Sequence, residues 1–361
     1  SVNEIENLIQ NNIKKSISDP DSKSISVALS GGVDSSLVLA LLKKSLPNSK
    51  INSFSIKFSN SIDESEQAAK IAESLDVEHK TILLDNYLLE LPKAISIIKE
   101  PFWDLHFYHV AKNSQDHDYL LSGDGADEIF AGYVFRYKKF LQSVTEKSTP
   151  LEKVKAYLAC HERDWIPEQE EIFSEKMDFS WEKIHSLLLP YFDNSLCLLD
   201  QVILADFNGK LLHNWSPLFS QISKSFNIKL VTPILSKETI DYAFSIPSHL
   251  KYDQNSNTGK LLLRKLLSKY VDKSLMQTKK QGFTVDTINL WKSYGKDICD
   301  NYITDGNIVN NGWVNKEWIV KNIHKTDLDI RHINKFLGLL GFEIWYRLFI
   351  THEINTNTKL E

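Results

Sequence analysis

The chain has 361 residues, a formal net charge of −5 at pH 7 and a pI of about 6.1. Hydrophobic residues make up 42% and charged residues 25%, ordinary values for a globular chain with one large core or two smaller ones. The acidic balance argues against broad binding to nucleic acid or to acidic membranes, because both partners require a basic surface.

The cysteines and the ends of the chain indicate its compartment. Cys160, Cys197 and Cys299 are far apart and form no C-x-x-C pair, which predicts free thiols in a reducing compartment and no zinc site. The first residues lack a secretion signal, and the apolar stretch 336–350 is too short to span a bilayer. We therefore expect a soluble, cytoplasmic protein with no membrane segment.

Strand and helix patterns alternate in the first part of the chain. A helix is predicted over 3–17, with Ile5, Leu8, Ile9 and Ile13 on one face. Strands then alternate with helices, which predicts the α/β class with a doubly wound, mostly parallel sheet. The carboxyl ends of its strands would meet at one edge, where ligands of such sheets bind. The predicted strands are 24–29, 51–58, 78–84 and 118–122, and the predicted helices are 35–46, 63–75, 86–99 and 104–115.

After about residue 140 the strand signal fades and the sequence reads mostly as helix, interrupted by prolines. We therefore expect three consecutive regions. They are an N-terminal helix over 1–22, an α/β region over 23–145, and a mainly helical region over 146–361.

The turn after the first predicted strand is the most informative motif. It reads Ser-Gly-Gly-Val-Asp-Ser-Ser over 30–36 and opens a helix. A glycine-rich turn at a helix N-terminus offers backbone N–H groups and a dipole that favour an anion. Asp34 would repel a phosphate unless Mg²⁺ lies between them, so the loop predicts a nucleoside triphosphate site with a metal. The spacing and the lysine of a Walker loop are missing.

A second motif follows the strand predicted over 118–122. Asp124, Asp127 and Glu128 lie within five residues and are flanked by glycines. The spacing does not fit an EF-hand, because no glutamate closes a twelve-residue loop. In a doubly wound sheet this loop would face the same crevice as Asp34, so two carboxylates from separate strands could hold one Mg²⁺.

Together these motifs resemble the synthetase domain of asparagine synthetase, within the PP-loop ATP pyrophosphatase superfamily. The same domain occurs in β-lactam synthetases and in some peptide cyclases. Weaker similarities extend the resemblance to roughly residues 10–350. They are found at 53–56, whose backbone would meet adenine, at 259–264, at 279–283 and at 340–345.

The resemblance implies a fold and a set of site residues. Asp34 and Asp127 would hold Mg²⁺, while Asp124 would orient or deprotonate the nucleophile and Lys280 would stabilise the negatively charged transition states. The residues implied for ATP are Leu29, Ser30, Gly31, Gly32, Asp34, Ser35, Ser36, Ile56 and Gly123.

Departures from the family pattern concentrate where the acceptor would bind. The family's Glu-x-Arg-x-Pro-Phe-Leu-Asp segment is replaced over 229–236, where Lys229, Val231 and Ser236 stand in place of its glutamate, arginine and aspartate. Thr278 replaces the arginine before the catalytic lysine. These changes leave the identity of the acceptor open and touch the ATP motifs little.

Two histidines also fall on a predicted helix. His106 and His109 share one face, but no third metal ligand has a suitable spacing, so we expect them to be structural or to line the substrate. The aromatic residues around them, among them Phe107 and Tyr108, are expected to pack in a core.

The implied activity is an ATP-dependent amide synthetase that releases AMP and pyrophosphate. A carboxylate would be adenylated and then transferred to ammonia or an amine. The chain has no cysteine before Cys160, so we expect no glutaminase activity of its own, and ammonia would come free or from a separate glutaminase subunit. A homo-oligomer is left open.

Other functions remain to be weighed at this point. Within the same class, the enzyme could form a β-lactam-like ring or cyclise a peptide. A tRNA-modifying PP-loop enzyme would belong to another class, but the catalytic cysteines and basic RNA-binding domain typical of such enzymes are not evident. A catalytically idle homologue is disfavoured because Asp34, Asp127 and Lys280 are retained.

Overall fold

The computed structural model describes residues 1–21, 23–58, 65–276 and 285–360. They form two compact units, and each is continuous in space although its segments are not consecutive in sequence. The units therefore interleave along the chain, whereas the sequence predicts consecutive regions with boundaries near 22 and 145. Unit 1 comprises 1–84, 106–141 and 196–284, and unit 2 comprises 85–105, 142–195 and 285–361.

Unit 1 is built on a sheet of five strands in the order β3-β2-β1-β4-β5. Every neighbouring pair in this sheet runs parallel, so the predicted α/β class and doubly wound parallel sheet are confirmed. The first four strands coincide with the predicted ones to within one residue at each end. The fifth was not predicted, because it is three residues long and starts at a lysine. The strands are β1 (Ser24–Ala28), β2 (Lys50–Phe58), β3 (Glu78–Leu84), β4 (Tyr119–Leu121) and β5 (Lys229–Val231).

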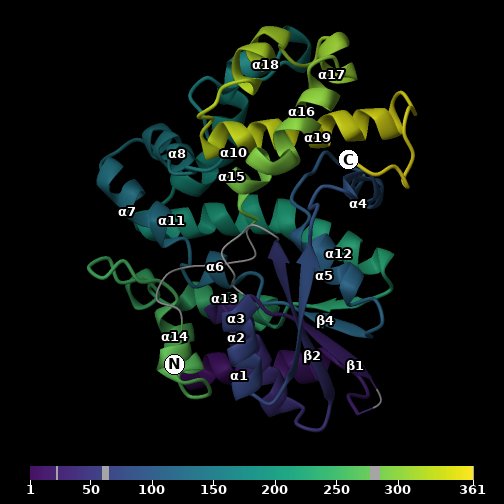
Figure 1. Cartoon of the computed structure of the whole chain (residues 1–361). Helices are drawn as coiled ribbons and strands as arrows, with labels where there is room; N and C mark the ends of the chain where they lie inside the picture. Colours follow the sequence, from purple (N-terminus) through teal and green to yellow (C-terminus); the bar gives the residue numbers. More distant parts are fainter. Residues whose placement is uncertain (22, 59–64, 277–284, 361) are drawn as a thin grey trace. The chain divides into compact units, whose positions relative to one another are not determined.

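The direction of winding reverses after β3. The chain moves outward through β1, α2 (Val33–Ser45), β2, α3 (Ser65–Ser74) and β3, then returns to place β4 on the other side of β1. Right-handed crossovers therefore put α2 and α3 on one face of the sheet and α5 (His106–Asn113) on the other, as Figure 1 shows. The reversal lies between β1 and β4, which is where open α/β sheets bind ligands.

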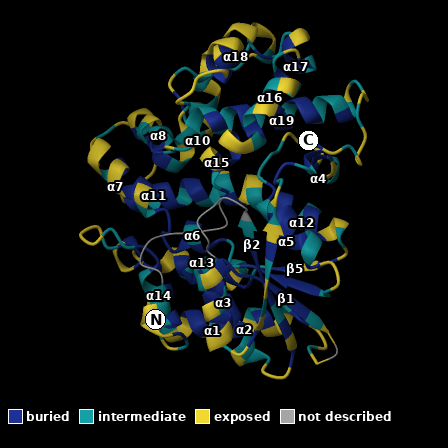
Figure 2. Ribbon diagram, in the orientation of Figure 1, coloured by how far each residue is buried: buried dark blue, intermediate teal, exposed yellow. Residues whose placement is uncertain are grey.

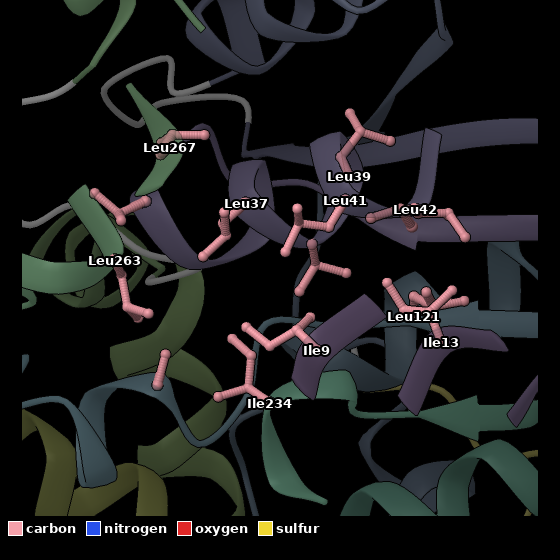
Figure 3. Close-up of a cluster of buried hydrophobic side chains, with 14 of the residues drawn as sticks. Ile9, Ile13, Leu37, Leu39, Leu41, Leu42, Leu121, Ile234, Leu263 and Leu267 are labelled. Atoms are coloured by element: carbon pink, nitrogen blue, oxygen red, sulfur yellow. The ribbon is translucent and has the colours of Figure 1, made fainter. Parts of the chain in front are cut away.

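The main core of unit 1 lies on the face covered by α2. Figure 3 shows its side chains converging from α1 (Val2–Ser16), α2, β4 and α14 (Leu261–Leu267). The sequence predicts an amphipathic helix after the glycine-rich turn, but α2 is buried over almost its whole length, from Val33 to Leu42. The difference arises because α1 and α14 cover the sides of α2 that the sheet leaves open.

Helix α1 is part of this core, because its apolar stripe of Ile5, Ile9 and Ile13 is fully buried. A charged cluster also holds it in place. Glu6 accepts hydrogen bonds from Lys44 Nζ on α2 at 2.7 Å and from Lys269 Nζ at 2.8 Å. Burial would raise the pKa of Glu6, but these two lysines and Tyr270 lower it to about 2.

The remaining elements of unit 1 are mostly short helices. Among them, η2 is a π-helical segment of ten residues that continues directly from α11 into α12. The elements are α6 (Ala126–Ile129), α7 (Val134–Ser143, which ends in unit 2), α11 (Leu198–Ala205), η2 (Asp206–Trp215), α12 (Ser216–Ser225), η3 (Pro233–Leu235), α13 (Lys237–Ser245), η4 (Ser248–Leu250) and η5 (Lys273–Leu275).

Unit 2 is helical throughout its named elements. Its longest helix is α19 (Ile330–Phe349), and Figure 2 shows the buried and exposed faces along it. Glu343 on α19 is fully buried and accepts the backbone N–H groups of Asn307 at 2.9 Å and Ile308 at 2.8 Å, which begin α17. The other elements are α4 (Leu91–Ile98), α8 (Pro150–Ala159), α9 (Gln169–Ile172), η1 (Glu175–Met177), α10 (Trp181–Phe192), α15 (Thr287–Leu290), η6 (Trp291–Gly295), α16 (Lys296–Ile303), α17 (Asn307–Asn310) and α18 (Lys316–Ile323).

Within the described residues, no helix combines the length and the apolar composition needed to cross a bilayer.

Candidate functional site

The glycine-rich turn lies at the carboxyl end of β1, where it forms a compact loop. Leu29 N–H donates to Phe54 O of β2 at 2.8 Å, which continues the sheet by one residue. Ser30 N–H then donates to Ser35 Oγ at 3.2 Å, and Gly32 N–H donates to Ser30 Oγ at 3.3 Å. Gly31 adopts a φ of +75°, which a residue with a side chain rarely adopts. The two serines thus hold the loop folded over the start of α2.

The first turn of α2 faces this loop. Its N-cap is Gly32, which has no side chain to occupy the N–H groups of the first turn. Ser35 and Ser36 are buried, and Asp34 lies in the first turn beside them. Backbone donors and the positive end of the helix dipole therefore share one place with a carboxylate, as the sequence predicts.

The acidic loop approaches α2 from the end of β4. The register Val27↔Leu121 aligns the loops that follow β1 and β4. A Cβ on Gly123 would lie 2.7 Å from Ser35 N and 2.8 Å from Asp34 Cβ, so a side chain at this position would force the two loops apart. Gly125, with a φ of +89°, makes the turn into α6. Glycine is therefore needed at 123 for close approach and at 125 for conformation.

Lys260 joins the two loops. Its Nζ lies 2.8 Å from Asp127 Oδ1 and also donates a hydrogen bond to Asp34 Oδ2. The lysine is 8% exposed, so this ammonium group is nearly withdrawn from water. Burial by itself would lower the pKa of Lys260, but the charges of Asp127 and Asp34 raise it above its usual value. The site is thus a charged triad of one lysine and two aspartates from three separate elements.

The backbone fixes Lys260 in this position. The residue is the N-cap of α14 and has a left-handed conformation with φ +55°. Its N–H donates to Phe130 O at 3.1 Å, directly after α6. A Cβ on Gly259 would overlap Ala131 O, and a Cβ on Gly132 would overlap both Asp127 Oδ1 and Lys260 Cε. The segments around 130 and 260 can therefore meet because two glycines leave the space.

Asp124 and Glu128 occupy less solvated positions in the acidic loop. Asp124 Oδ2 accepts a hydrogen bond from Ser122 Oγ at 2.6 Å, and burial raises the pKa of Asp124 although Ser122 and His106 oppose this. Burial and the neighbouring charge of Asp127 raise the pKa of Glu128 to about 7. Glu128 Oε1 also accepts a hydrogen bond from Tyr133 OH at 2.5 Å.

A buried ion pair packs next to the acidic loop and supports it. Arg136 Nη1 lies 2.6 Å from Asp206 Oδ1, and both side chains are almost fully buried. The Arg136 guanidinium also lies over the ring of Tyr133, 4.0 Å from its centroid. The loop is therefore linked through Tyr133 and Arg136 to the start of η2.

Most of the residues proposed from the sequence lie at this edge of the sheet. Leu29, Ser30, Gly31, Gly32, Ser35 and Ser36 form the loop after β1, and Gly123, Asp124 and Asp127 form the loop after β4. Ile56 is at the same end of β2, two residues beyond the pair Ala28↔Phe54. Lys280 lies outside the described residues, so its role stays a prediction. No group of three or more His, Cys, Asp or Glu side chains suited to a metal is found in the described part of the chain.

Lys260 is the central residue that sequence reasoning missed. Gly259 and Lys260 precede an apolar helix and resemble the family pattern only weakly, so we assigned the lysine no role from the sequence. A lysine at a helix start is normally solvated, and the burial of this one depends on contacts with Asp127 and Asp34, which are distant in the sequence. The available sequence signal for this contact was the pair of glycines at 132 and 259, which leave room for the two segments to meet.

The chain was compared with known proteins. The asparagine synthase family pattern matches residues 6–347. The chain belongs to the asparagine synthase family. It is 25% identical over 357 residues to asparagine synthetase [glutamine-hydrolyzing] 1 of Bacillus subtilis (strain 168), covering 89% of this chain and 56% of that protein. It is 23% identical over 371 residues to a putative asparagine synthetase [glutamine-hydrolyzing] of Mycobacterium tuberculosis (strain ATCC 25618 / H37Rv), covering 92% and 55%.

Membership of the asparagine synthase family confirms the resemblance inferred from the two motifs. The chain spans about half the length of these curated relatives. Among solved structures, NMN synthetase from Francisella tularensis matches with a TM-score of 0.31 and 18% identity, over 58% of this chain and 94% of that one. This structural similarity is too low to indicate a function, so the functional proposal is based on the geometry of the site.

Proposed function

We propose that this chain is an ATP-dependent carbon–nitrogen ligase that activates a carboxylate as an acyl adenylate and transfers it to ammonia or an amine. The observation that carries the proposal is the convergence of the loop over 30–36, Asp127 and Lys260 at the switch point of the sheet. Family membership supports the same chemistry. This arrangement combines helix N–H donors, hydroxyls and a buried cation, which suits a polyphosphate.

The first step would form the adenylate. A carboxylate oxygen of the substrate attacks the α phosphorus of ATP, and the bond from this phosphorus to the bridging oxygen breaks, so that pyrophosphate leaves. Negative charge grows on the leaving β and γ phosphates. The N–H groups of the first turn of α2, the loop serines and the Lys260 ammonium are the groups on this chain that would stabilise it.

The second step would form the amide. A neutral amine attacks the carbonyl carbon, the carbon–oxygen bond to AMP breaks, and one proton is lost from the nitrogen. A carboxylate beside the acceptor can accept this proton or orient the amine. Asp124 is the candidate for this role, because it lies in the acidic loop and is held by Ser122.

The donor set of Asp34 and Asp127 fits a magnesium ion. Both carboxylates already converge on one cation, the Lys260 ammonium, and Mg²⁺ prefers hard oxygen ligands of this kind. We propose that these two aspartates hold Mg²⁺ when the nucleotide is present. The ion would supply charge neutralisation at the phosphates, and Lys260 would then turn from the carboxylates toward phosphate oxygens.

We further propose that the nitrogen comes from ammonia or another amine, supplied free or by a separate glutaminase subunit. The relatives named above are glutamine-hydrolysing, and this chain spans about half of their length. Comparing ammonium and glutamine as donors for the purified chain tests this point: amide formation is expected with ammonium, and glutamate release from glutamine would contradict it.

The ligase proposal is tested by pyrophosphate release. The protein is incubated with ATP, Mg²⁺, ammonium and a panel of carboxylates, and Asp34→Asn is compared with wild type. We expect the variant to be slower by roughly a thousandfold, because it loses one of the two proposed metal ligands. Asp116→Asn, at an exposed position of the same unit, should behave as wild type. Near-normal turnover in Asp34→Asn would refute the assignment.

A further inference from the structure

Three aromatic rings meet where the start of α5 contacts the end of η2 and α12. His106 on α5 lies 5.6 Å from Trp215 and 5.7 Å from Phe219, measured between ring centroids, and Trp215 lies 5.3 Å from Phe219. Phe219 is buried and stacks on Phe107 at 4.0 Å, so it anchors the group. His106 and Trp215 are half-buried and keep part of their surface accessible. We call His106, Trp215 and Phe219 the aromatic triad.

The aromatic triad is electrostatically coupled to the site. Among the charges acting on the Asp124 carboxylate, His106 is the one that favours its ionised form, whereas Asp34 and Asp127 oppose it. His106 is the first residue of α5, the helix that leads into β4, and the acidic loop follows β4. Because a helix that precedes a parallel strand runs opposite to that strand, His106 lies toward the carboxyl edge of the sheet, where Asp124 is found.

Contacts at both ends hold η2 in place and thereby fix the position of Trp215. Asp206 at the start of η2 pairs with buried Arg136, directly behind the acidic loop. Trp215 ends η2 and contacts α5 through His106. π-helical turns are uncommon, and those that interrupt α-helices are found frequently at functional sites. The segment thus connects the residue that pairs with Arg136 to the ring that contacts His106.

The segment after β5 adds apolar surface to the same loop. Ser122 N–H donates to Val231 O at 3.2 Å, so the two strand ends are directly bonded. Val231 and Ile234 are buried, and the Leu235 side chain lies against Gly125. The residues of 231–235 are therefore apolar or carry a hydroxyl, and none of them is charged. This segment therefore offers no charged side chain that could pair with the ionic groups of a substrate such as aspartate.

We infer that the carboxylate substrate bears an aromatic group that packs against the aromatic triad, and that free aspartate is a poor substrate. The inference rests on the proposed ligase function and names its acceptor class. An aryl group would gain apolar contact and favourable ring–ring geometry with Trp215 and His106. The charged amino and carboxyl groups of aspartate would have to be desolvated against the same surface, which is unfavourable.

The test uses the full chain with ATP, Mg²⁺ and hydroxylamine, which traps acyl adenylates as hydroxamates. Benzoate, phenylacetate and 3-phenylpropanoate are compared with L-aspartate. We expect kcat/KM for at least one aryl acid to exceed that for aspartate by tenfold or more. Trp215→Leu should then raise KM for that acid by tenfold or more and leave KM for ATP within twofold. Trp215→Phe, which keeps a ring, should retain most of the affinity, and Phe244→Leu, an exposed ring of the same unit, is the matched control.

Each other outcome overturns the inference. A preference for aspartate, the absence of turnover with every aryl acid, or an unchanged KM in Trp215→Leu would each do so. The circular dichroism of both Trp215 variants shows whether they fold, and the comparison of aryl acids with aspartate in the wild type decides the matter if the leucine variant does not. Binding of ATP and Mg²⁺ that depends on Asp34, measured without any acid, separates a wrong acceptor class from failure of the ligase proposal itself.

Discussion

Lys260 places a buried ammonium between two carboxylates that the sequence assigns to a metal. Its Nζ contacts Asp127 at 2.8 Å and also bonds Asp34, and the three side chains come from α14, α6 and α2. The two glycine-rich motifs allowed both aspartates to be named from the sequence. The lysine could not be, because its burial depends on packing between distant segments and not on any local pattern.

Removing this lysine should destabilise the protein before any substrate is added. In Lys260→Met two carboxylates would face each other in a poorly solvated site, so we expect the free energy of unfolding to fall by about 3 kcal/mol. Millimolar Mg²⁺ should restore more stability to this variant than it adds to wild type, because the ion can take the place of the ammonium. Urea unfolding with and without Mg²⁺ measures both effects.

Lys265→Met provides the matched control, since Lys265 lies on the same helix with its side chain exposed. It should change neither the unfolding free energy nor the response to Mg²⁺. Equal stability of Lys260→Met and wild type would show that the ammonium group does not hold the two carboxylates together.

Gly132 offers a steric test of the same site. A methyl group at this position would overlap Asp127 Oδ1 and Lys260 Cε, so Gly132→Ala should displace the triad and lower pyrophosphate release by roughly a hundredfold. Gly209→Ala is the control, because a Cβ there meets no atom within 4 Å. Turnover of Gly132→Ala close to that of Gly209→Ala would mean that the contact is not needed for catalysis.

At the scale of the elements, the alternating pattern predicted the first four strands well, because each lies between turn signals, although the edge strand β3 is mostly exposed. Strand β5 was missed because three residues carry too little pattern to be seen. The π-helical segment η2 was equally invisible, since its sequence resembles an ordinary helix and its widened turns follow from what lies at its ends. The acceptor side proposed above depends on these two elements, so the sequence could not predict it.

The end of η4 contains a lysine that is costly to bury. Lys251 is 1% exposed, and burial lowers its pKa from 10.5 to about 8, opposed by the charges of Asp200 and Cys197. Below pH 8 the lysine is charged in both the folded and the unfolded protein, so the cost of burial is fully present. Between pH 8 and 10.5 the unfolded chain holds the extra proton, and stability from this group rises with pH.

Lys251→Met should therefore stabilise the protein by about 1–3 kcal/mol at pH 7. The advantage over wild type should shrink as the pH is raised through the window from about 8 to 10.5. Chemical denaturation at pH 7 and pH 10 checks both the sign and the trend. A variant less stable than wild type at pH 7 would indicate that the attraction of Lys251 to nearby negative charge outweighs its desolvation.

At the scale of the whole molecule, the candidate site belongs to one unit. The described residues of the loops after β1 and β4 and the start of α14 all fall in unit 1. The chain leaves this unit and returns to it twice before its last segment joins unit 2, and a sequence read segment by segment gives no sign of that. The interleaving of the two units depends on long-range packing. The sequence patterns report only local structure, so they led us to expect consecutive regions.

Binding of ATP with Mg²⁺ should therefore protect unit 1 first. We expect amide hydrogen exchange to slow by tenfold or more in 30–36, 122–133 and 259–264, because ligand binding stabilises the segments it contacts. Exchange in α18 of unit 2 should change little. Exchange followed by mass spectrometry on wild type and on Asp34→Asn tests this, and protection confined to unit 2 would place the nucleotide elsewhere.

The parallel register of β1 and β4 also sets limits on how the length of this gene can vary. One codon inserted within 119–121 would advance the acidic loop by about 3.3 Å and turn the following side chains to the opposite face of the sheet. Gly123 and Asp127 would then no longer meet α2 and Lys260. Insertions in the exposed turn over 254–257, which is closed by the bridge between Asp253 and Thr258, would move neither strand. Natural length variants should accordingly accumulate at such turns and be absent between 119 and 133.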